Sequence, residues 1–409
     1  DFYIDLITMY FRPRLSDGRM APIAWQIQLF FLNVNWPLED DATWIRRRVD
    51  NFIVIIGFIM LLLCNLAECS YVVHYIQDIG RVLEGLATYL ILIEIHCRIY
   101  SMAFRKQAFK ELLKEFYAKI YIERDYNYKM YRKIKQNLLP TVLYSYSYIG
   151  TLFSYLAIPV VGFFTNRRLL PFKMLFPFDY TQMTIYIPTL FVTIWLGVVV
   201  VSFVIAESNL LATIILHLNG RYILLQQDCQ HLHASLIGSC HSERIVIEFR
   251  QSLVRIIQRN EQLNDFAAKL QAEYSFRIFM MMGMSSVLLC VLGFKAVTLG
   301  MTSENIGYIC WIAAKILELV VFGELGSQLI FTTNAMSSMY YLCNWEDVIL
   351  QSSNSVENTQ LMKLIALAIE VNQKPMYVTG FNYFRVSLVT VVSILQGAGS
   401  YFTCLYAFR

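Results

Sequence analysis

Residues 185–206 read IYIPTLFVTIWLGVVVVSFVIA, and none of these 22 side chains is charged. About 20 predominantly apolar residues in a helix are enough to cross the hydrocarbon core of a bilayer, which is ~30 Å thick. The stretch therefore predicts a membrane-spanning helix, which we extend to Ile185–Leu216.

The same pattern recurs along the whole chain, with shorter polar segments between the apolar runs. We therefore expect an all-α, polytopic membrane protein with seven transmembrane helices. The expected spans are Phe52–Val73, Leu83–Phe104, Leu138–Phe164, Ile185–Leu216, Phe276–Leu299, Ile306–Thr332 and Phe381–Phe408.

Composition supports lipid as the solvent. Of 409 residues, 57% are hydrophobic and only 16% are charged, whereas a soluble domain needs about a quarter charged. The net charge of +4 is small and the basic residues are not gathered on one element, so nucleic-acid binding is excluded. The nine cysteines contain no CxxC pair, which argues against a disulfide framework or a zinc site. We expect no metal and no cofactor.

Enzymatic motifs are also missing. The six histidines form no HExxH, and no glycine-rich phosphate loop follows a strand, so we expect that the protein is not an enzyme. A membrane transporter remains an alternative. Transporters often carry paired sequence repeats with helices broken near the middle of the membrane. No such repeat is evident, although Pro159 and Pro188 interrupt the third and fourth spans.

Positive charge sets the expected orientation. Of the 34 Lys and Arg residues, 24 lie in the N-terminal segment and in the loops on its side of the membrane. Positive residues are retained in the cytoplasm, so we expect a cytoplasmic N-terminus and an extracellular C-terminus. This orientation is inverted relative to G-protein-coupled receptors.

The spans divide the chain into six expected segments. They are a cytoplasmic N-terminal segment (1–51), the first four spans forming most of a ligand-binding bundle (52–216), a cytoplasmic segment (217–275), the fifth and sixth spans (276–332), a cytoplasmic anchor region with a short helix (333–380) and a pore-lining last helix (381–409).

Three polar segments have the apolar spacing of amphipathic helices: Phe109–Tyr117, Leu253–Leu270 and Gln360–Asn372. All three fall on the expected cytoplasmic side. Helices that project from a membrane must pack on something, and packing within one chain and contact between subunits both remain open.

Ionisable residues inside spans are candidate functional residues. Glu94 and Arg98 lie four residues apart, and Lys315 and Glu318 lie three apart, so each pair is expected to form an ion pair on its own helix. For the second pair, a role in coupling ligand to pore is the alternative. Glu207 lies toward the cytoplasmic end of its span.

The last seventy residues resemble one family in particular. The motifs, in order, are Tyr341-Leu342-Cys343-Asn344-Trp345, Gln373-Lys374-Pro375, Phe384-Arg385-Val386-Ser387-Leu388 and Ser400-Tyr401-Phe402. Their order resembles that of insect odorant receptors. Gustatory receptors share the architecture but usually end the last span with Thr-Tyr and a later Gln-Phe. The shared co-receptor carries a long extra segment between its fourth and fifth spans, and this chain does not.

The resemblance implies a tuning subunit of an odorant-gated, nonselective cation channel in the plasma membrane of olfactory neuron dendrites. Such a subunit would assemble with the odorant receptor co-receptor as a heterotetramer around one cation pore. A small volatile odorant and membrane lipids would be its other partners. A gustatory-type receptor channel or a transporter is the alternative function.

The resemblance also implies an apolar and aromatic odorant cavity in the outer half of the membrane, which mildly favours a ring-bearing ligand. We favour Leu86, Tyr89 and Leu90, which match the family's pocket positions and share a helical face. Outer-half aromatic residues can equally belong to the interfacial belt. The full set of candidates is Leu86, Tyr89, Leu90, Tyr148, Ile149, Leu152, Tyr155, Phe191, Trp195, Tyr308 and Trp311.

In the last span, Ser393, Gly397, Ser400, Cys404 and Phe408 lie three or four residues apart and share one face. Small residues at this spacing suit either a wet pore or close helix packing in lipid. The resemblance implies a pore, and the family's hydrophobic gate falls on the end of this helix. The candidate pore and gate residues are Ser400, Cys404, Ala407 and Phe408.

Overall fold

The computed structural model describes residues 10–33, 36–236, 244–298 and 303–407, and these are mostly helical. The elements are α2 (Trp25–Gln28), η1 (Leu29–Asn33), α3 (Trp44–His74), α4 (Ile79–Phe104), α5 (Lys106–Glu115), η2 (Phe116–Ile120), α6 (Tyr128–Asn137), α7 (Leu139–Phe164), α8 (Met183–Gln230), α9 (Leu232–Leu236), α10 (Ile245–Thr298), α11 (Ser303–Tyr341), α12 (Trp345–Leu350), α13 (Ser355–Val371), β1 (Thr379–Gly380), β2 (Phe384–Arg385) and α14 (Leu388–Ala407).

Each predicted span lies largely or wholly within one helix. Among the described residues, five helical stretches are long and apolar enough to cross a membrane, namely α3, α6 continued by α7, α8, α10 and α11. The predicted second span is α4, which carries Arg81, Glu84, Glu94 and Arg98. The predicted seventh is α14, a shorter apolar helix.

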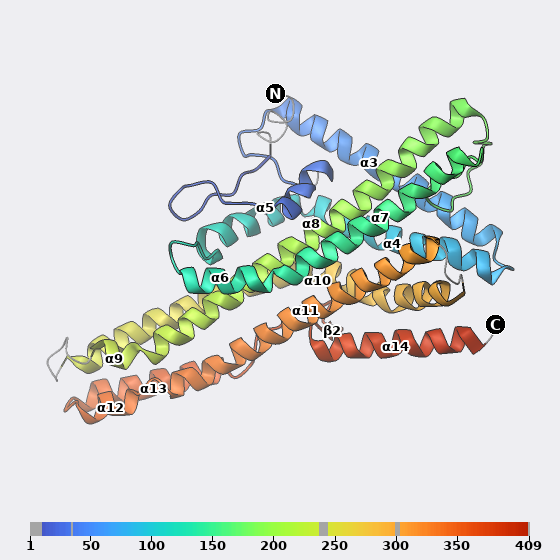
Figure 1. The fold of residues 1–409 in the computed structure, drawn as a ribbon. Coiled ribbons are helices and arrows are strands. Elements are labelled where there is room, and N and C mark those ends of the chain that lie inside the picture. Colours follow the sequence, from blue (N-terminus) through green and yellow to red (C-terminus); the bar gives the residue numbers. More distant parts are fainter. Residues whose placement is uncertain (1–9, 34–35, 237–243, 299–302, 408–409) are drawn as a thin grey trace.

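Long helices run side by side along the length of the molecule (Figure 1). Helix α11 packs against α7 and α8, while α10 packs against α4, α11 and α14. The segment between α7 and α8 lies at the same end of the molecule as the C-terminus, and α9, α12 and α13 lie at the opposite end (Figure 1).

Three helices run well beyond the predicted spans. The predicted segment boundaries at 217, 276 and 333 fall inside α8, α10 and α11, which continue through them without a break. Hydropathy marks where a helix enters lipid but not where it ends, because a helix that leaves the membrane becomes polar without unwinding. The predicted segments are therefore not separately folded units, and their positions relative to the membrane stay a prediction.

The amphipathic helices pack within the chain. Leu253 and Leu270 of α10 and Leu361 and Ile365 of α13 are buried, and α13 contacts both α10 and α11. These contacts confirm the predicted helical faces and give them a partner inside this chain. The predicted continuation after the second span is α5, separated from α4 by a single non-helical residue, Arg105.

The N-terminal segment folds onto the bundle through an aromatic core. The fully buried Trp36 donates its indole N–H to the carbonyl of Phe11 at 2.6 Å, and its ring packs edge-on against Phe109 of α5. Lys110 and Lys114 donate hydrogen bonds to Asp40 at 2.7 and 2.8 Å and hold the pKa of that carboxyl at about 2.

The predicted start of the last span at Phe381 is wrong. Residues 379–385 form a short hairpin, in which Gly380 pairs with Phe384. Phe381 and Asn382 have φ values of 49° and 59°, the left-handed backbone that tight hairpin turns require. Apolar residues suit a strand as well as a helix, so composition alone could not separate the hairpin from α14.

The hairpin is held against α10 and brings α14 close to α11. Gln271 accepts from the backbone N–H of Thr379 at 2.7 Å and donates to its carbonyl at 3.0 Å. At Gly326 of α11, a side chain would collide with the backbone carbonyl of Val386. This glycine therefore permits the close approach that seats the start of α14.

The prediction that Pro159 and Pro188 interrupt their helices is wrong. Both lie inside α7 and α8, which continue past them. Proline removes one backbone hydrogen bond, and membrane helices tolerate this where nearby hydroxyls take up the loss.

Candidate functional site

A small cavity of about 60 Å³ lies where α3, α4, α7, α8 and α11 meet. Sites for drug-sized ligands measure ~300–1,000 Å³, so this one suits a much smaller molecule. Its lining is almost wholly apolar and aromatic, and comprises Glu68, Thr88, Ile91, Leu92, Tyr148, Thr151, Leu152, Tyr155, Phe172, Leu196, Gly197, Val200, Val201, Val204 and Trp311.

Aromatic rings form one wall of the cavity. The ring centroid of Tyr155 lies 5.4 Å from that of Phe172 and 6.1 Å from that of Trp311, the latter pair edge-on at 83°. Gly197 makes room for this wall, because a Cβ there would lie 2.9 Å from Leu152 and 3.0 Å from Phe172. Aromatic side chains supply large contact areas, so the burial of apolar surface would contribute most of the free energy of ligand binding in this cavity.

A second, smaller pocket of about 30 Å³ adjoins the first and shares Thr88 and Tyr155 with it. It is more polar, since Glu84, Ser154 and Lys173 belong to its lining, together with Tyr308. The two pockets lie one beyond the other along α4 and α7.

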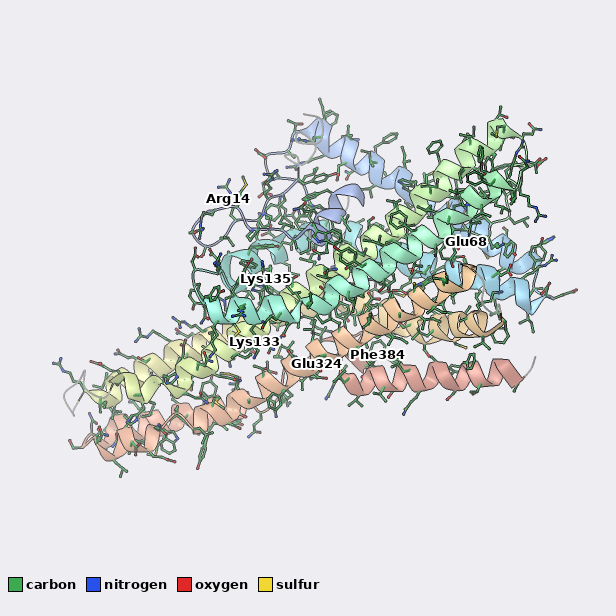
Figure 2. All side chains as sticks on the ribbon, in the orientation of Figure 1. Arg14, Glu68, Lys133, Lys135, Glu324 and Phe384 are labelled. Atoms are coloured by element: carbon green, nitrogen blue, oxygen red, sulfur yellow. The ribbon has the colours of Figure 1, made fainter. Side chains whose placement is uncertain are left out.

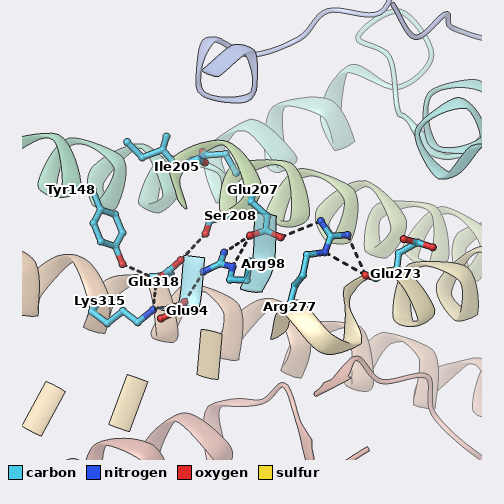
Figure 3. A network of polar contacts seen from close by, with 11 residues as sticks. Glu94, Arg98, Tyr148, Ile205, Glu207, Ser208, Glu273, Arg277, Lys315 and Glu318 are labelled. Atoms are coloured by element: carbon cyan, nitrogen blue, oxygen red, sulfur yellow. Dashed lines mark hydrogen bonds and ion pairs between the residues drawn. The ribbon is translucent and has the colours of Figure 1, made fainter. Parts of the chain in front are cut away.

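Tyr148 connects the cavity to a buried polar network (Figure 3). Its hydroxyl donates to Glu318 of α11 at 2.7 Å. Lys315 donates to the same oxygen at 3.2 Å, and the other carboxylate oxygen of Glu318 accepts from Ser208 of α8 at 2.6 Å. A ligand that moves Tyr148 would therefore disturb a charged group outside the cavity.

The network joins six charged side chains from α4, α8, α10 and α11 (Figure 3). Arg98 pairs with Glu94 at 2.7 Å and donates to Glu207 at 2.7 Å, and Arg277 pairs with Glu207 at 3.1 Å. Lys315 closes the chain at 3.6 Å from Glu94. Three cations balance three carboxylates, and every one of these side chains is at most 2% exposed.

Both ion pairs predicted from the sequence are confirmed, Glu94 with Arg98 and Lys315 with Glu318. Glu207, which the sequence places only toward the end of its span, is instead a central member of the network. Arg277 was missed because it is the second residue of its predicted span and therefore resembles a flanking charge.

Helix α14 has one packed face and one open face. Val391 and Ala398 are buried on the side that packs against α10 and α11. The exposed side carries the apolar Val389, Val392 and Tyr401. Beside them runs a line of small and polar residues, which we call the open face of α14: Ser393, Gln396, Ser400, Thr403 and Ala407.

A sequence model described as "7tm Odorant receptor" matches residues 78–399, most of the chain. This chain belongs to the insect odorant receptor family. Odorant receptor 74a of Drosophila melanogaster is 39% identical over 401 residues, covering 98% of this chain and 99% of that receptor. Odorant receptor 35a of the same species is 36% identical and covers 96% of each chain.

A solved structure has the same fold as this odorant receptor. The olfactory receptor OR5 of Machilis hrabei, in complex with eugenol, superposes with a TM-score of 0.73 over 100% of this chain and 96% of that one, at 13% identity. The relatives are receptors rather than enzymes, which confirms the prediction that this protein is not an enzyme.

Of the eleven predicted odorant contacts, four line the cavity of this receptor, namely Tyr148, Leu152, Tyr155 and Trp311. Tyr308 lines the adjoining pocket. Ile149 is half-buried beside the core, outside the lining, and Phe191 and Trp195 are 69% and 37% exposed on the surface of α8.

The favoured residues Leu86, Tyr89 and Leu90 are half-buried on α4 and do not line the cavity. The residues of α4 that do are Thr88, Ile91 and Leu92, roughly a third to half a turn around the helix. As odorant contacts, the favoured three stay a prediction.

Sequence reasoning missed Glu68 and Phe172 of this receptor, both of which line the cavity. Glu68 was detectable as an acidic residue within an apolar span. Phe172 lies in the segment between α7 and α8, and no periodicity points from a loop into a bundle.

In the predicted pore region, Ser400, Cys404 and Ala407 are exposed on α14, and Phe408 lies outside the described residues. Gly397 is not on the open face, because a Cβ there would lie 3.4 Å from Ser286 of α10. Ser393, Ser400 and Cys404 of the predicted stripe are exposed, and so are Gln396 and Thr403 beside them.

Proposed function

We propose that this receptor is an odorant-binding tuning subunit of a ligand-gated, nonselective cation channel in the plasma membrane, and that it assembles with the odorant receptor co-receptor. The observation that carries this proposal is the small aromatic cavity, whose Tyr148 hydrogen-bonds the buried charge network at Glu318. Helix α14 packs against α11, which also lines the cavity. Its open face supplies a surface for a pore shared between subunits.

The proposed orientation keeps the N-terminus and the segments 217–275 and 333–380 in the cytoplasm, with seven crossings that include α4 and α14. Two observations support it. Lys and Arg are concentrated in these segments, and the C-terminus lies at the end of the molecule opposite α12 and α13 (Figure 1). The six charges of the network balance, which allows α4 to lie within a membrane despite Glu94 and Arg98.

The proposed function is tested by recording from cells that express the receptor alone, the co-receptor alone, or both, during perfusion with a mixed panel of volatiles. We expect fast cation currents that require both chains and persist when G-protein signalling is blocked. Currents abolished by that block would favour a metabotropic receptor. Substrate uptake without current would favour a transporter. Responses to soluble tastants alone would favour a gustatory-type channel.

Replacing Trp311 by alanine is expected to raise the half-maximal odorant concentration roughly tenfold or more, because losing an aromatic wall of the cavity removes more than ~1.4 kcal/mol of ligand burial. The matched control is Tyr89→Ala, which truncates a half-buried aromatic on α4 outside the lining. Dose–response curves for the panel's strongest odorant measure both. A larger shift for Tyr89→Ala would contradict the cavity and restore the pocket favoured from the sequence.

A further inference from the structure

Glu68 is a buried acid in the wall of the odorant cavity. It lies on α3, within the bundle (Figure 2), and its side chain lines the cavity while the residue is only 1% exposed. Neither the predicted odorant contacts nor the charge network includes it.

The carboxyl of Glu68 has no counter-charge. Glu94, Glu207 and Glu318 each lie within ion-pair distance of an Arg or Lys, whereas within the described part of the chain no cation reaches Glu68. A buried carboxyl that lacks a cation in apolar surroundings stays neutral, because ionisation without a partner is too costly there. Glu68 therefore enters the cavity as a carboxylic acid, with one O–H donor and one carbonyl acceptor.

The hydrogen-bonding capacity of this acid is only partly used. Thr88 lies beside the carboxyl, but its own hydroxyl hydrogen goes to the carbonyl of Gly85 at 3.0 Å. The Oε2 atom of Glu68 is buried and has no hydrogen-bond partner among the residues that the structure describes. Buried polar atoms are nearly always paired, and because this one lies in a cavity wall, a molecule in the cavity is placed to supply its partner.

The rest of the lining limits what that partner can be. Apart from Glu68, the polar groups are hydroxyls, and that of Tyr148 is already committed to Glu318. Aliphatic and aromatic side chains such as Ile91, Leu196 and Trp311 make up the remainder. The complementary ligand has one polar end for Glu68 and a hydrocarbon body for the walls.

We propose that Glu68 is the hydrogen-bonding group with which this cavity recognises small, neutral volatiles that carry a hydroxyl or carbonyl oxygen. This inference rests on the proposed function of the cavity as an odorant site. A neutral acid serves either ligand type, since it donates to a carbonyl and both donates to and accepts from a hydroxyl. A site for protonated amines would need Glu68 to be ionised. No cation among the described residues that line the cavity stabilises the ionised form before a ligand binds.

The test compares straight-chain alcohols, aldehydes, alkanes and primary amines of matched chain length on receptor co-expressed with the co-receptor. Glu68→Leu keeps the bulk and removes the hydrogen bond, and Glu68→Gln keeps a donor and an acceptor but cannot ionise. We expect Glu68→Leu to raise the half-maximal concentration for alcohols and aldehydes roughly tenfold. Alkanes should respond as in the unmodified receptor, and Glu68→Gln should stay within about threefold of it.

Surface labelling shows which variants reach the membrane, and Glu324→Leu is the matched control. Glu324 is an exposed glutamate on α11, away from the cavity (Figure 2), and its loss should change no ligand's response. Unchanged alcohol and aldehyde curves in surface-expressed Glu68→Leu would overturn the proposal. The proposal would also be contradicted if both Glu68 variants lost their responses to amines and kept their responses to alcohols. A receptor that responds only to alkanes or only to amines would contradict it as well. If the unmodified pair gives no odorant current at all, the proposed function fails instead.

Discussion

Replacing Arg98 by methionine is expected to destabilise the receptor by roughly 3–5 kcal/mol and to leave little of it at the cell surface. Arg98 is 2% exposed and is the cation shared by Glu94 and Glu207. Its removal leaves three buried carboxylates facing two cations. Since native proteins are stable by only ~5–15 kcal/mol, an uncompensated buried charge of this kind removes much of the margin.

The charge balance of the network gives this prediction an internal control. Adding Glu94→Leu to Arg98→Met removes one charge of each sign and leaves Glu207 with Arg277 and Lys315 with Glu318. Well-packed apolar replacements of a whole buried pair are often tolerated. The double variant should therefore recover a substantial part of the lost surface receptor.

Surface fluorescence and the thermal unfolding midpoint in detergent measure both variants. Arg81→Met is the matched control, because Arg81 pairs with Asp78 on the surface, where both side chains are more than half exposed, and such pairs contribute ~0–1 kcal/mol. A double variant no more abundant than Arg98→Met alone would show that packing of the long side chain, and not charge balance, is what Arg98 provides.

The helices were predictable because the bilayer imposes a length. Each predicted span lies largely or wholly in one helix, and both ion pairs follow from spacing along a single helix. Pairing between helices was not predictable. Arg98 reaches Glu207 across 109 positions in the sequence, and nothing in the local pattern of either helix names the other.

The odorant cavity was predicted only in part for the same reason. Helical periodicity groups Leu86, Tyr89 and Leu90 on one face of α4, but it does not say which face meets α7 and α11. That choice depends on the rotation of each helix, and the structure turns Thr88 and Ile91 toward the cavity instead. Tyr155 and Trp311 were found on α7 and α11 because they are aromatic residues in the outer halves of the predicted spans, and both line the cavity.

Replacing Ser400 by lysine is expected to reduce odorant-evoked cation current more than tenfold while surface expression is retained. Ser400 lies near the middle of the open face of α14, and its hydroxyl donates to Gln396 of its own helix at 3.0 Å. If this face lines the proposed pore, a fixed positive charge there meets every permeating cation. At ~5 Å and an effective dielectric constant of ~20, the repulsion is about 3 kcal/mol, more than a hundredfold in occupancy.

The matched control is Ser400→Glu, which introduces a side chain of comparable bulk and the opposite charge. In a pore it attracts cations, so the current should be preserved or increased, and the preference for cations over anions should rise. Whole-cell currents with the co-receptor and reversal potentials in dilute salt measure both effects. Equal loss in the two variants would mean that the open face packs against a neighbouring helix, where any charge is unwelcome. A dependence on the sign of the charge is the result that only a water-filled cation path produces.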